Sequence, residues 1–334
     1  WMTAQGCSDD AATMPTDMPT DMPADMRAVL DAAAQARIGQ PAFFEQSAED
    51  ARLWMRRRFT PYWNRNPVPL ARVEALMLPG GGGPLAARLY DPGVAAPAPA
   101  LLWLHGGGWT LGDLDSHDAL CRRLAALAGC RVVALDYRLA PEHPFPAAFE
   151  DACATVDFLG RHGAALGLDP ARLVVGGDSA GAHLALAATR AARDAGTPLP
   201  AGLALVYGAY RFDLASPSWQ RYGDPYFLLS RNDTAWFWAN HLPRNYVAGS
   251  DWRVEPGLGE LAGLPPVWLA VGDHDPLWDD NVALARDLEA AGNECTFDRW
   301  PGLVHGAALF FDAVDGAVLG LERLSRWLRT TFEA

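Results

Sequence analysis

The sequence contains few positive charges for its content of negative ones. Among 334 residues, Lys and Arg total 27 while Asp and Glu total 40, which gives a formal net charge of −13. Because the phosphates of nucleic acids and anionic lipid surfaces repel so acidic a chain, we expect neither as a partner. No basic run interleaved with aromatic residues is present either, so a nucleic-acid-binding function is disfavoured.

Long apolar runs and paired cysteines are also missing. No apolar stretch reaches the roughly 18 residues that a membrane helix needs, and no basic-then-apolar signal peptide is visible at the N-terminus. The five cysteines are scattered without C-x-x-C spacing, which argues against a zinc site or a disulfide framework. We therefore expect no membrane association, no metal and a reducing, cytoplasmic location.

The chain divides into segments of different character. Its hydrophobic content of 50% is ample for one large domain with a small appendage. A near-repeat of Met, Pro, Thr and Asp ends at Met26, so residues 1–26 are expected to be disordered or extended. Residues 27–66 have helical apolar periodicity, and residues 67–334 are expected to form the main domain. Within it, an insertion at about 211–250 is rich in aromatics and lacks a convincing strand.

The main domain alternates short apolar runs with helical stretches. Continuous apolar strands that alternate with helices predict an α/β fold, with a mostly parallel sheet of about eight strands covered on both faces. The first two strands, separated by the glycines before Pro84, are expected to form an antiparallel hairpin at one edge. The expected strands are 73–78, 86–90, 100–104, 131–136, 173–176, 201–207, 267–271 and 295–299. The expected helices are 116–128, 146–165, 180–195, 280–291 and 307–332.

Ser179 lies in the pattern Gly-x-Ser-x-Gly, where an expected strand becomes an expected helix. A sharp turn there requires very small residues two positions before and after the serine, and Gly177 and Gly181 meet that requirement. The turn presents the hydroxyl clear of the sheet, and the positive end of the following helix dipole points towards it. A purely structural turn is the alternative, but this setting favours a nucleophile.

A serine nucleophile needs a base, and the base needs an acid to orient it. In hydrolases with this turn, the acid and then the histidine follow the serine along the chain. His305, after the last expected strand, is favoured as the base over His241 in the aromatic insertion and over His274. The segment "GDHDPLWDD" follows the expected strand 267–271, and the last two of its aspartates also suit helix capping. Its candidate acids are Asp273, Asp275, Asp279 and Asp280.

Three glycines, residues 106–108, come directly after the expected strand 100–104. Glycine lets the backbone approach a substrate closely and turn its N–H groups towards a developing oxyanion. A phosphate-binding loop is the alternative for a glycine cluster, but neither G-x-x-x-x-G-K-[ST] nor G-x-G-x-x-G after a strand is present. The cluster therefore indicates an oxyanion-binding loop.

Five stretches in this order resemble the hormone-sensitive-lipase-like carboxylesterases, bacterial family IV of the α/β-hydrolase fold. They are "HGGGW" from His105, "DYRLAPEHPFPAAFED" from Asp136, "GGDSAGAHLA" from Gly176, "LPPVWLAVGDHDPLWDD" from Leu264 and "LVHG" from Leu303. The resemblance extends over about residues 70–330, and the five stretches in register make it far more specific than any single motif.

The resemblance implies a role for particular residues of this chain. It implies an α/β-hydrolase catalytic domain over residues 67–334, and a helical cap built from residues 27–66 and the insertion at about 211–250. His105 and the stretch from Tyr137 would support the glycine loop. The implied triad and oxyanion-hole donors are Ser179, Asp275, His305, Gly107, Gly108 and Ala180.

The expected function is hydrolysis of short-to-medium acyl esters, small-molecule substrates, through an acyl-enzyme and without metal or organic cofactor. Trp109 and Tyr210 are candidates for walls of the substrate pocket, with plain packing as the alternative for each. Two rival functions are an amidase or peptidase with the same triad, and a non-catalytic small-molecule receptor like the plant gibberellin receptors, which resemble this family but lack the histidine. Because family members often form dimers, the resemblance also implies that a homodimer can form.

Overall fold

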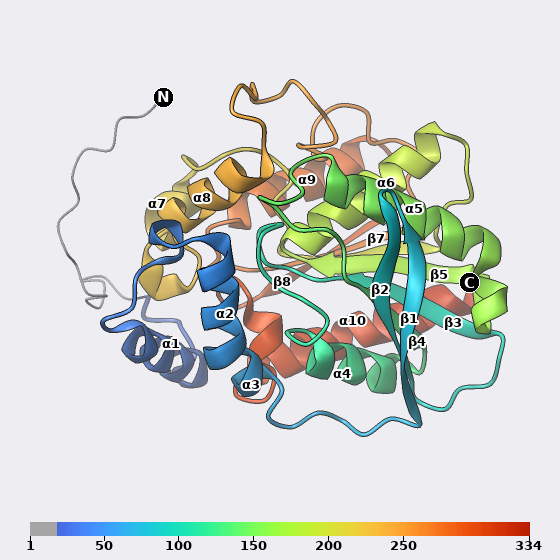
Figure 1. Cartoon of the computed structure of the whole chain (residues 1–334), viewed down its shortest axis with the longest axis horizontal. Helices are drawn as coiled ribbons and strands as arrows, with labels where there is room; N and C mark the ends of the chain where they lie inside the picture. Colours follow the sequence, from blue (N-terminus) through green and yellow to red (C-terminus); the bar gives the residue numbers. More distant parts are fainter. Residues whose placement is uncertain (1–18) are drawn as a thin grey trace.

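The computed structural model describes residues 19–334, and a sheet of eight strands lies at their centre in the order β1-β2-β4-β3-β5-β6-β7-β8 (Figure 1). β1 and β2 form the expected edge hairpin, and β2 is also antiparallel to β4. Every other neighbouring pair is parallel, which confirms the expected fold class. The strands are β1 Arg72–Gly80, β2 Gly83–Asp91, β3 Ala98–Leu104, β4 Arg131–Leu135, β5 Leu168–Asp178, β6 Gly202–Val206, β7 Val267–Gly272 and β8 Cys295–Trp300.

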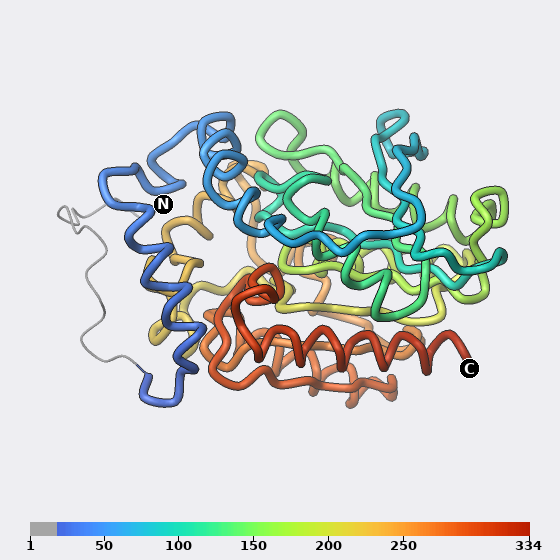
Figure 2. The backbone as a smooth tube through the Cα atoms, turned by 90° about the horizontal axis from the view of Figure 1, so that it is seen from below, coloured from blue at the N-terminus to red at the C-terminus, as the bar shows by residue number. Residues whose placement is uncertain are grey.

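Helices cover both faces of this sheet. The α-helices are α1 Ala24–Arg37, α2 Ala48–Arg58, α3 Thr60–Trp63, α4 Asp118–Ala128, α5 Ala147–His162, α6 Ala180–Asp194, α7 Pro217–Tyr222, α8 Arg231–His241, α9 Trp278–Ala290 and α10 Asp315–Glu333. Four short 3-10 helices are η1 Phe43–Glu45, η2 Gly163–Leu166, η3 Pro225–Phe227 and η4 Ala307–Phe310. α5, α6 and α9 pack into the core on one face, and α4 and α10 on the other (Figures 1 and 2). Within the described part of the chain, none of these helices is both long and apolar enough to cross a bilayer.

The central strands are continuous apolar runs because both of their faces are buried. In β3, Leu102 and Leu104 belong to one core cluster, whereas Leu101 and Trp103 belong to the other. Successive side chains of a strand point to opposite faces, so a strand covered by helices on both sides has no polar face to show. This pattern made the inner strands recognisable in the sequence.

The N-terminal helices and the insertion after β6 lie at the same end of the molecule (Figures 1 and 2). The guanidinium of Arg37, at the end of α1, donates hydrogen bonds to the carbonyls of Pro225 and Leu228. The hydroxyl of Tyr226 donates to Asp31 on α1 at 2.8 Å. Within the described residues, the insertion contains helices and no strand between β6 and β7, in keeping with its sequence.

Two expected segment boundaries differ from the structure. Most of the segment 1–26 lies outside the described residues, but α1 begins at Ala24 and therefore includes the last three of its residues. The expected helix 307–332 is divided into η4 and α10 by a turn, and α10 begins only at Asp315. Hydrophobic periodicity continues through this turn because its residues are buried, so the pattern alone did not reveal the break.

Candidate active site

Ser179 occupies a strained turn between β5 and α6. Its φ and ψ are 54° and −120°, a conformation that non-glycine residues rarely adopt. The backbone N–H of Ser179 donates to the carbonyl of Val206 at 2.8 Å, which ties the turn to β6. A Cβ on Gly177 would lie 2.3 Å from the Leu104 carbonyl oxygen, and a Cβ on Gly181 would lie 1.8 Å from it. Both glycines are therefore required by close backbone packing against β3.

The structure brings Ser179, His305 and Asp275 together from the ends of three different strands. Nε2 of His305 lies 2.9 Å from Oγ of Ser179, and Nδ1 of His305 lies 2.9 Å from Oδ2 of Asp275. The carboxyl group of Asp275 is fully buried, and its other oxygen accepts a hydrogen bond from the N–H of Leu277 at 2.8 Å. With Nδ1 donating to this carboxylate, Nε2 of His305 is left as an acceptor that faces the hydroxyl of Ser179.

The other candidate bases and acids point elsewhere. Nε2 of His274 lies 3.2 Å from Asp21 in the segment before α1, and His241 stacks on Trp109. Asp273 is paired with Arg299 and accepts from the N–H of Gly302. None of these groups contacts Ser179.

Asp279 and Asp280, for which helix capping was an alternative to a catalytic role, lie in the first turn of α9 and bind groups of the insertion. The carboxylate of Asp279 accepts from the N–H of Ser218 at 2.8 Å. The carboxylate of Asp280 accepts from the N–H groups of Tyr210 and Arg211 and from the Arg211 guanidinium at 2.8 Å. Both side chains therefore fasten the insertion to α9, because partners from a distant segment compete with the local cap.

The expected oxyanion loop follows β3 and lines the same cavity as Ser179 and His305. Gly107 and Gly108 have φ values of 123° and 58°, which favour glycine. Ala180 lines the cavity as well and is the first residue of α6, where backbone N–H groups have no partner inside the helix. All three residues expected to form the oxyanion hole therefore line the same cavity as Ser179.

A buried pair, His117 and Asp178, supports this loop. The sequence did not predict this role for either residue. Oδ1 of Asp178 accepts from the N–H of Gly106 at 3.1 Å and lies 3.1 Å from Nε2 of His117. Burial raises the pKa of Asp178, but His117 and the Gly106 N–H outweigh it and hold that pKa below its usual range. On the opposite side, the Tyr137 hydroxyl donates to the His105 carbonyl at 2.7 Å. The glycine loop is thus anchored at its first residues by buried polar groups.

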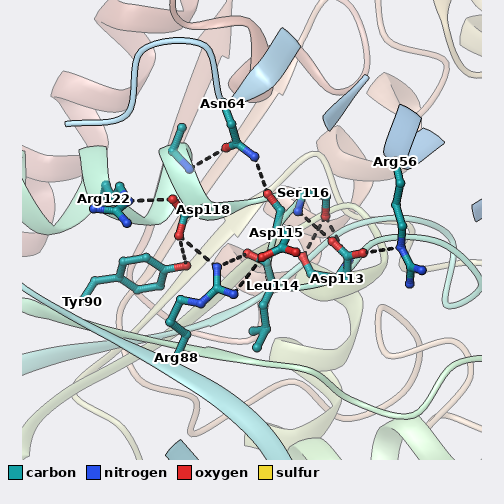
Figure 3. A network of polar contacts seen from close by, with 11 residues as sticks. Arg56, Asn64, Arg88, Tyr90, Asp113, Leu114, Asp115, Ser116, Asp118 and Arg122 are labelled. Atoms are coloured by element: carbon teal, nitrogen blue, oxygen red, sulfur yellow. Dashed lines mark hydrogen bonds and ion pairs between the residues drawn. The ribbon is translucent and has the colours of Figure 1, made fainter. Parts of the chain in front are cut away.

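The segment from Asp113 to Asp118, just after the loop, is held by a network of polar contacts (Figure 3). Arg56 of α2 donates to Asp113 at 2.9 Å, and the side chain and N–H of Ser116 also contact Asp113. Arg88 of β2 donates to Asp118 at 2.9 Å, and this carboxylate also accepts from Tyr90 and Arg122. The loop is therefore fixed between the N-terminal helices, the sheet edge and α4.

A cavity of about 1090 Å³, counting its open mouth, lies above Ser179. Trp109, one of the two residues predicted to form a pocket wall, is among the residues that line it. Tyr210, the other, is not among them and is fully buried in the core, which favours the alternative of plain packing for it. The reason is the Asp280 carboxylate, which binds the N–H of Tyr210 at 2.6 Å and fixes the backbone with the ring packed against Gly208. Apolar side chains from the N-terminal helices and the insertion form much of the wall, among them Phe43, Met55, Phe59, Trp63, Leu229 and Phe237.

Buried histidines around the site make the folded protein sensitive to acid. Burial lowers the pKa of His105 and of His183 to about 4, and it lowers the pKa of His241 well below 6.5. These groups stay neutral in the folded chain but take up protons in the unfolded one. Their stabilisation is therefore complete above about pH 6.5 and is lost as the pH falls towards 4.

We expect the urea midpoint of unfolding to fall between pH 7 and pH 5. At pH 5, His105 and His183 each cost about 2 kcal/mol relative to neutral pH. Asp280 opposes them, because burial raises its pKa to about 6 and it gains stability as the pH falls through that value. Equilibrium unfolding followed by tryptophan fluorescence at both pH values measures the net loss. A midpoint that is unchanged or higher at pH 5 would contradict the prediction.

Comparison with known proteins identifies relatives over most of the chain. The family described as the alpha/beta hydrolase fold matches residues 101–309. The carboxylic ester hydrolase LipN of Mycobacterium tuberculosis is 40% identical over 271 residues, which cover 79% of this chain and 72% of that protein. The ethyl acetate hydrolase of Pseudomonas putida is 38% identical over 258 residues, which cover 74% of this chain and 80% of that protein.

A solved structure agrees with these sequences. The ester-hydrolase EH1AB1 from the metagenome of Lake Arreo, solved with a bipyridine phosphonate derivative, has a TM-score of 0.89 at 32% identity. The match covers 94% of this chain and 100% of that one. Fold and site together thus define an enzyme of the α/β-hydrolase class. Within that class, the chain belongs to the hormone-sensitive-lipase-like carboxylesterases, which confirms the family resemblance of its motifs.

Proposed function

We propose that the chain hydrolyses short-to-medium acyl esters through a triad of Ser179, His305 and Asp275. The observation that carries this proposal is the pair of contacts made by His305, at 2.9 Å to the Ser179 hydroxyl and at 2.9 Å to the buried Asp275 carboxylate. This is the geometry that a base between a nucleophile and an orienting acid requires. Ser179 and His305 line a largely apolar cavity large enough for a small ester, and Asp275 is buried behind His305.

The reaction proceeds by two acyl transfers. His305 takes the hydroxyl proton as Oγ of Ser179 attacks the ester carbonyl, and Asp275 stabilises the imidazolium that forms. The N–H groups of Gly107, Gly108 and Ala180 stabilise the oxyanion. His305 then gives the proton to the departing alcohol, which leaves an acyl group on Ser179. Water, activated by the same histidine, attacks the acyl-enzyme and releases the acid.

The substrate range follows from the walls of the cavity. Phe43, Phe59 and Trp63 of the N-terminal segment line it, which favours an apolar acyl or alcohol group of limited length. The name of the Pseudomonas putida relative, an ethyl acetate hydrolase, supports small esters. We expect p-nitrophenyl acetate and butyrate to give a higher kcat/KM than the palmitate ester.

A phosphonate probe tests the mechanism directly. We expect a p-nitrophenyl alkylphosphonate to release one equivalent of p-nitrophenolate per chain, because the oxyanion site and the base act on the phosphoryl group as on an ester. Peptide mass spectrometry should find the adduct on Ser179, and residual esterase activity should fall in proportion to labelling. Protein unfolded in urea, where the triad is not assembled, is the control and should not react.

The phosphonate probe, combined with turnover of matched ester and anilide substrates, separates the rival functions. An adduct on another residue, or none, would contradict the proposed triad. An amidase with this triad would hydrolyse butyryl p-nitroanilide at a rate comparable with that of p-nitrophenyl butyrate. A receptor would bind small molecules in the cavity without turnover of either substrate.

A further inference from the structure

Trp109, the residue that follows the oxyanion glycines, has an unusual backbone conformation. Its φ is 56°, in the left-handed region that side chains other than glycine rarely occupy, and only 2% of the residue is exposed. Such a conformation persists only where surrounding contacts enforce it. A hydrogen bond holds part of this backbone in place, since the Trp109 carbonyl accepts from the N–H of Ala140 at 2.8 Å. The indole ring is held separately.

The contacts of that ring come chiefly from α8, in the insertion. The imidazole of His241 stacks on the Trp109 indole with centroids 4.5 Å apart and planes at 12°, and Trp238 packs on it at 4.4 Å. The same helix presses on the neighbouring glycine, because a Cβ on Gly108 would lie 2.3 Å from the ring of Phe237. Three residues of α8 therefore contact the loop that carries the oxyanion donors.

The His241 imidazole packs against Trp109 through its flat face, and within the described residues its ring makes no hydrogen bond. It is 1% exposed, and within residues 19–334 neither of its ring nitrogens has a hydrogen-bond partner. Its place is fixed through its backbone, because its carbonyl accepts from the N–H of Phe145 at 2.8 Å. A buried imidazole without partners loses the solvation of its nitrogens, so the ring contributes here through its contacts with aromatic neighbours such as Trp109.

We propose that His241 is a positioning residue: by stacking on Trp109, it holds the Gly107 and Gly108 N–H groups where the oxyanion forms. The inference rests on the proposed function, since it concerns the same site. Oxyanion donors act mainly in the transition state, so a displaced loop lowers kcat more than it changes KM. The insertion therefore contributes to the chemical step as well as to the pocket wall.

A comparison of His241→Phe with His241→Leu tests this role. Phenylalanine keeps the flat ring and removes only nitrogens that have no partner, whereas leucine fills a similar volume without a ring. We expect His241→Phe to keep kcat and KM within about twofold of the wild type. We expect His241→Leu to lower kcat for p-nitrophenyl butyrate about tenfold and to keep KM within about twofold of the wild type. The expected loss is smaller than the ~10²–10³-fold loss of kcat caused by removing one oxyanion donor, because the donors are displaced and not removed.

Phe212→Ala is the matched control. Phe212 packs edge-on against Trp238 at 5.2 Å, in the same aromatic cluster, and is partly exposed. The Phe212→Ala variant should keep the wild-type kcat even if its melting temperature is lower. Circular dichroism establishes that each variant is folded at the assay temperature. If His241→Leu fails to fold, His241→Met, whose flexible side chain also lacks a plane, takes its place.

Two results would overturn the inference. One is a kcat for folded His241→Leu equal to that of the wild type, and the other is a loss in His241→Phe as large as in His241→Leu. Neither result touches the proposed function, which fails only if the wild type shows no turnover that depends on Ser179. The phosphonate reaction gives an independent measure, since its rate constant should follow kcat across the three variants.

Discussion

Replacement of Ser179 by alanine is expected to lower kcat for p-nitrophenyl acetate by about 10⁴- to 10⁶-fold while KM stays within a few-fold. The hydroxyl of Ser179 is the group that His305 faces at 2.9 Å, so without it no acyl-enzyme forms. Substrate binding depends chiefly on the apolar walls of the cavity, from which this substitution removes only the Ser179 hydroxyl. Initial rates of purified protein over a range of substrate concentrations separate kcat from KM.

Ser325→Ala is the matched control for this substitution. Ser325 is 1% exposed on α10, and within the described residues its hydroxyl has no hydrogen-bond partner. Both variants lose a hydroxyl oxygen, but only that of Ser179 lies beside His305. We expect Ser325→Ala to keep the wild-type kcat. Retention of more than a few per cent of the wild-type kcat in Ser179→Ala would contradict the assignment of the nucleophile.

The serine turn was predictable because its requirements are local. A strand that ends in Gly-x-Ser-x-Gly before a helix leaves room for only one kind of turn, and the structure has the strained φ of 54° at Ser179. The expected parallel sheet supplied the rest, since the carboxyl ends of parallel strands lie at one edge of the sheet. In the structure β5, β6, β7 and β8 are successive parallel strands, so the loops after β5, β7 and β8 bring Ser179, Asp275 and His305 together.

The choice of acid could not be derived from local pattern. Asp273, Asp275, Asp279 and Asp280 all follow β7, and only the family resemblance favoured Asp275. The structure separates them by partners far away in sequence, such as Arg299 for Asp273 and Ser218 for Asp279. The position of Tyr210 in the core depends on a distant partner in the same way, because the Asp280 carboxylate binds its N–H group.

The contacts between the insertion and the oxyanion loop could not be predicted from the sequence either. The segment around His241 is rich in aromatics, and such density is as compatible with ordinary core packing as with a functional surface. What distinguishes His241 is its stacking partner, Trp109, which is 132 positions away in the sequence, and this pairing depends on how the insertion packs on the loop after β3. The same holds for His117 and Asp178, whose contact joins α4 to β5.

The second large effect is expected at the glycine after the serine turn. In Gly181→Ala the new Cβ would lie 1.8 Å from the Leu104 carbonyl oxygen and 2.7 Å from that of His105. Both oxygens belong to backbone at the end of β3, so α6 or β3 must shift. Because this backbone carries the oxyanion loop and the serine, we expect a loss of about 3 kcal/mol or more in the free energy of unfolding. We also expect kcat to fall more than tenfold in the folded fraction.

Gly160→Ala distinguishes this steric effect from a general response to added methyl groups. Gly160 lies inside α5, and a Cβ there would be 3.6 Å from Pro198, an ordinary contact. Alanine stabilises a helix interior by about 1 kcal/mol relative to glycine, so this variant should be slightly more stable and fully active. Urea unfolding and kcat measured on both variants test the pair. Equal stability of Gly181→Ala and the wild type would show that α6 can withdraw from β3 at little cost, and the turn at Ser179 would then not depend on its glycine.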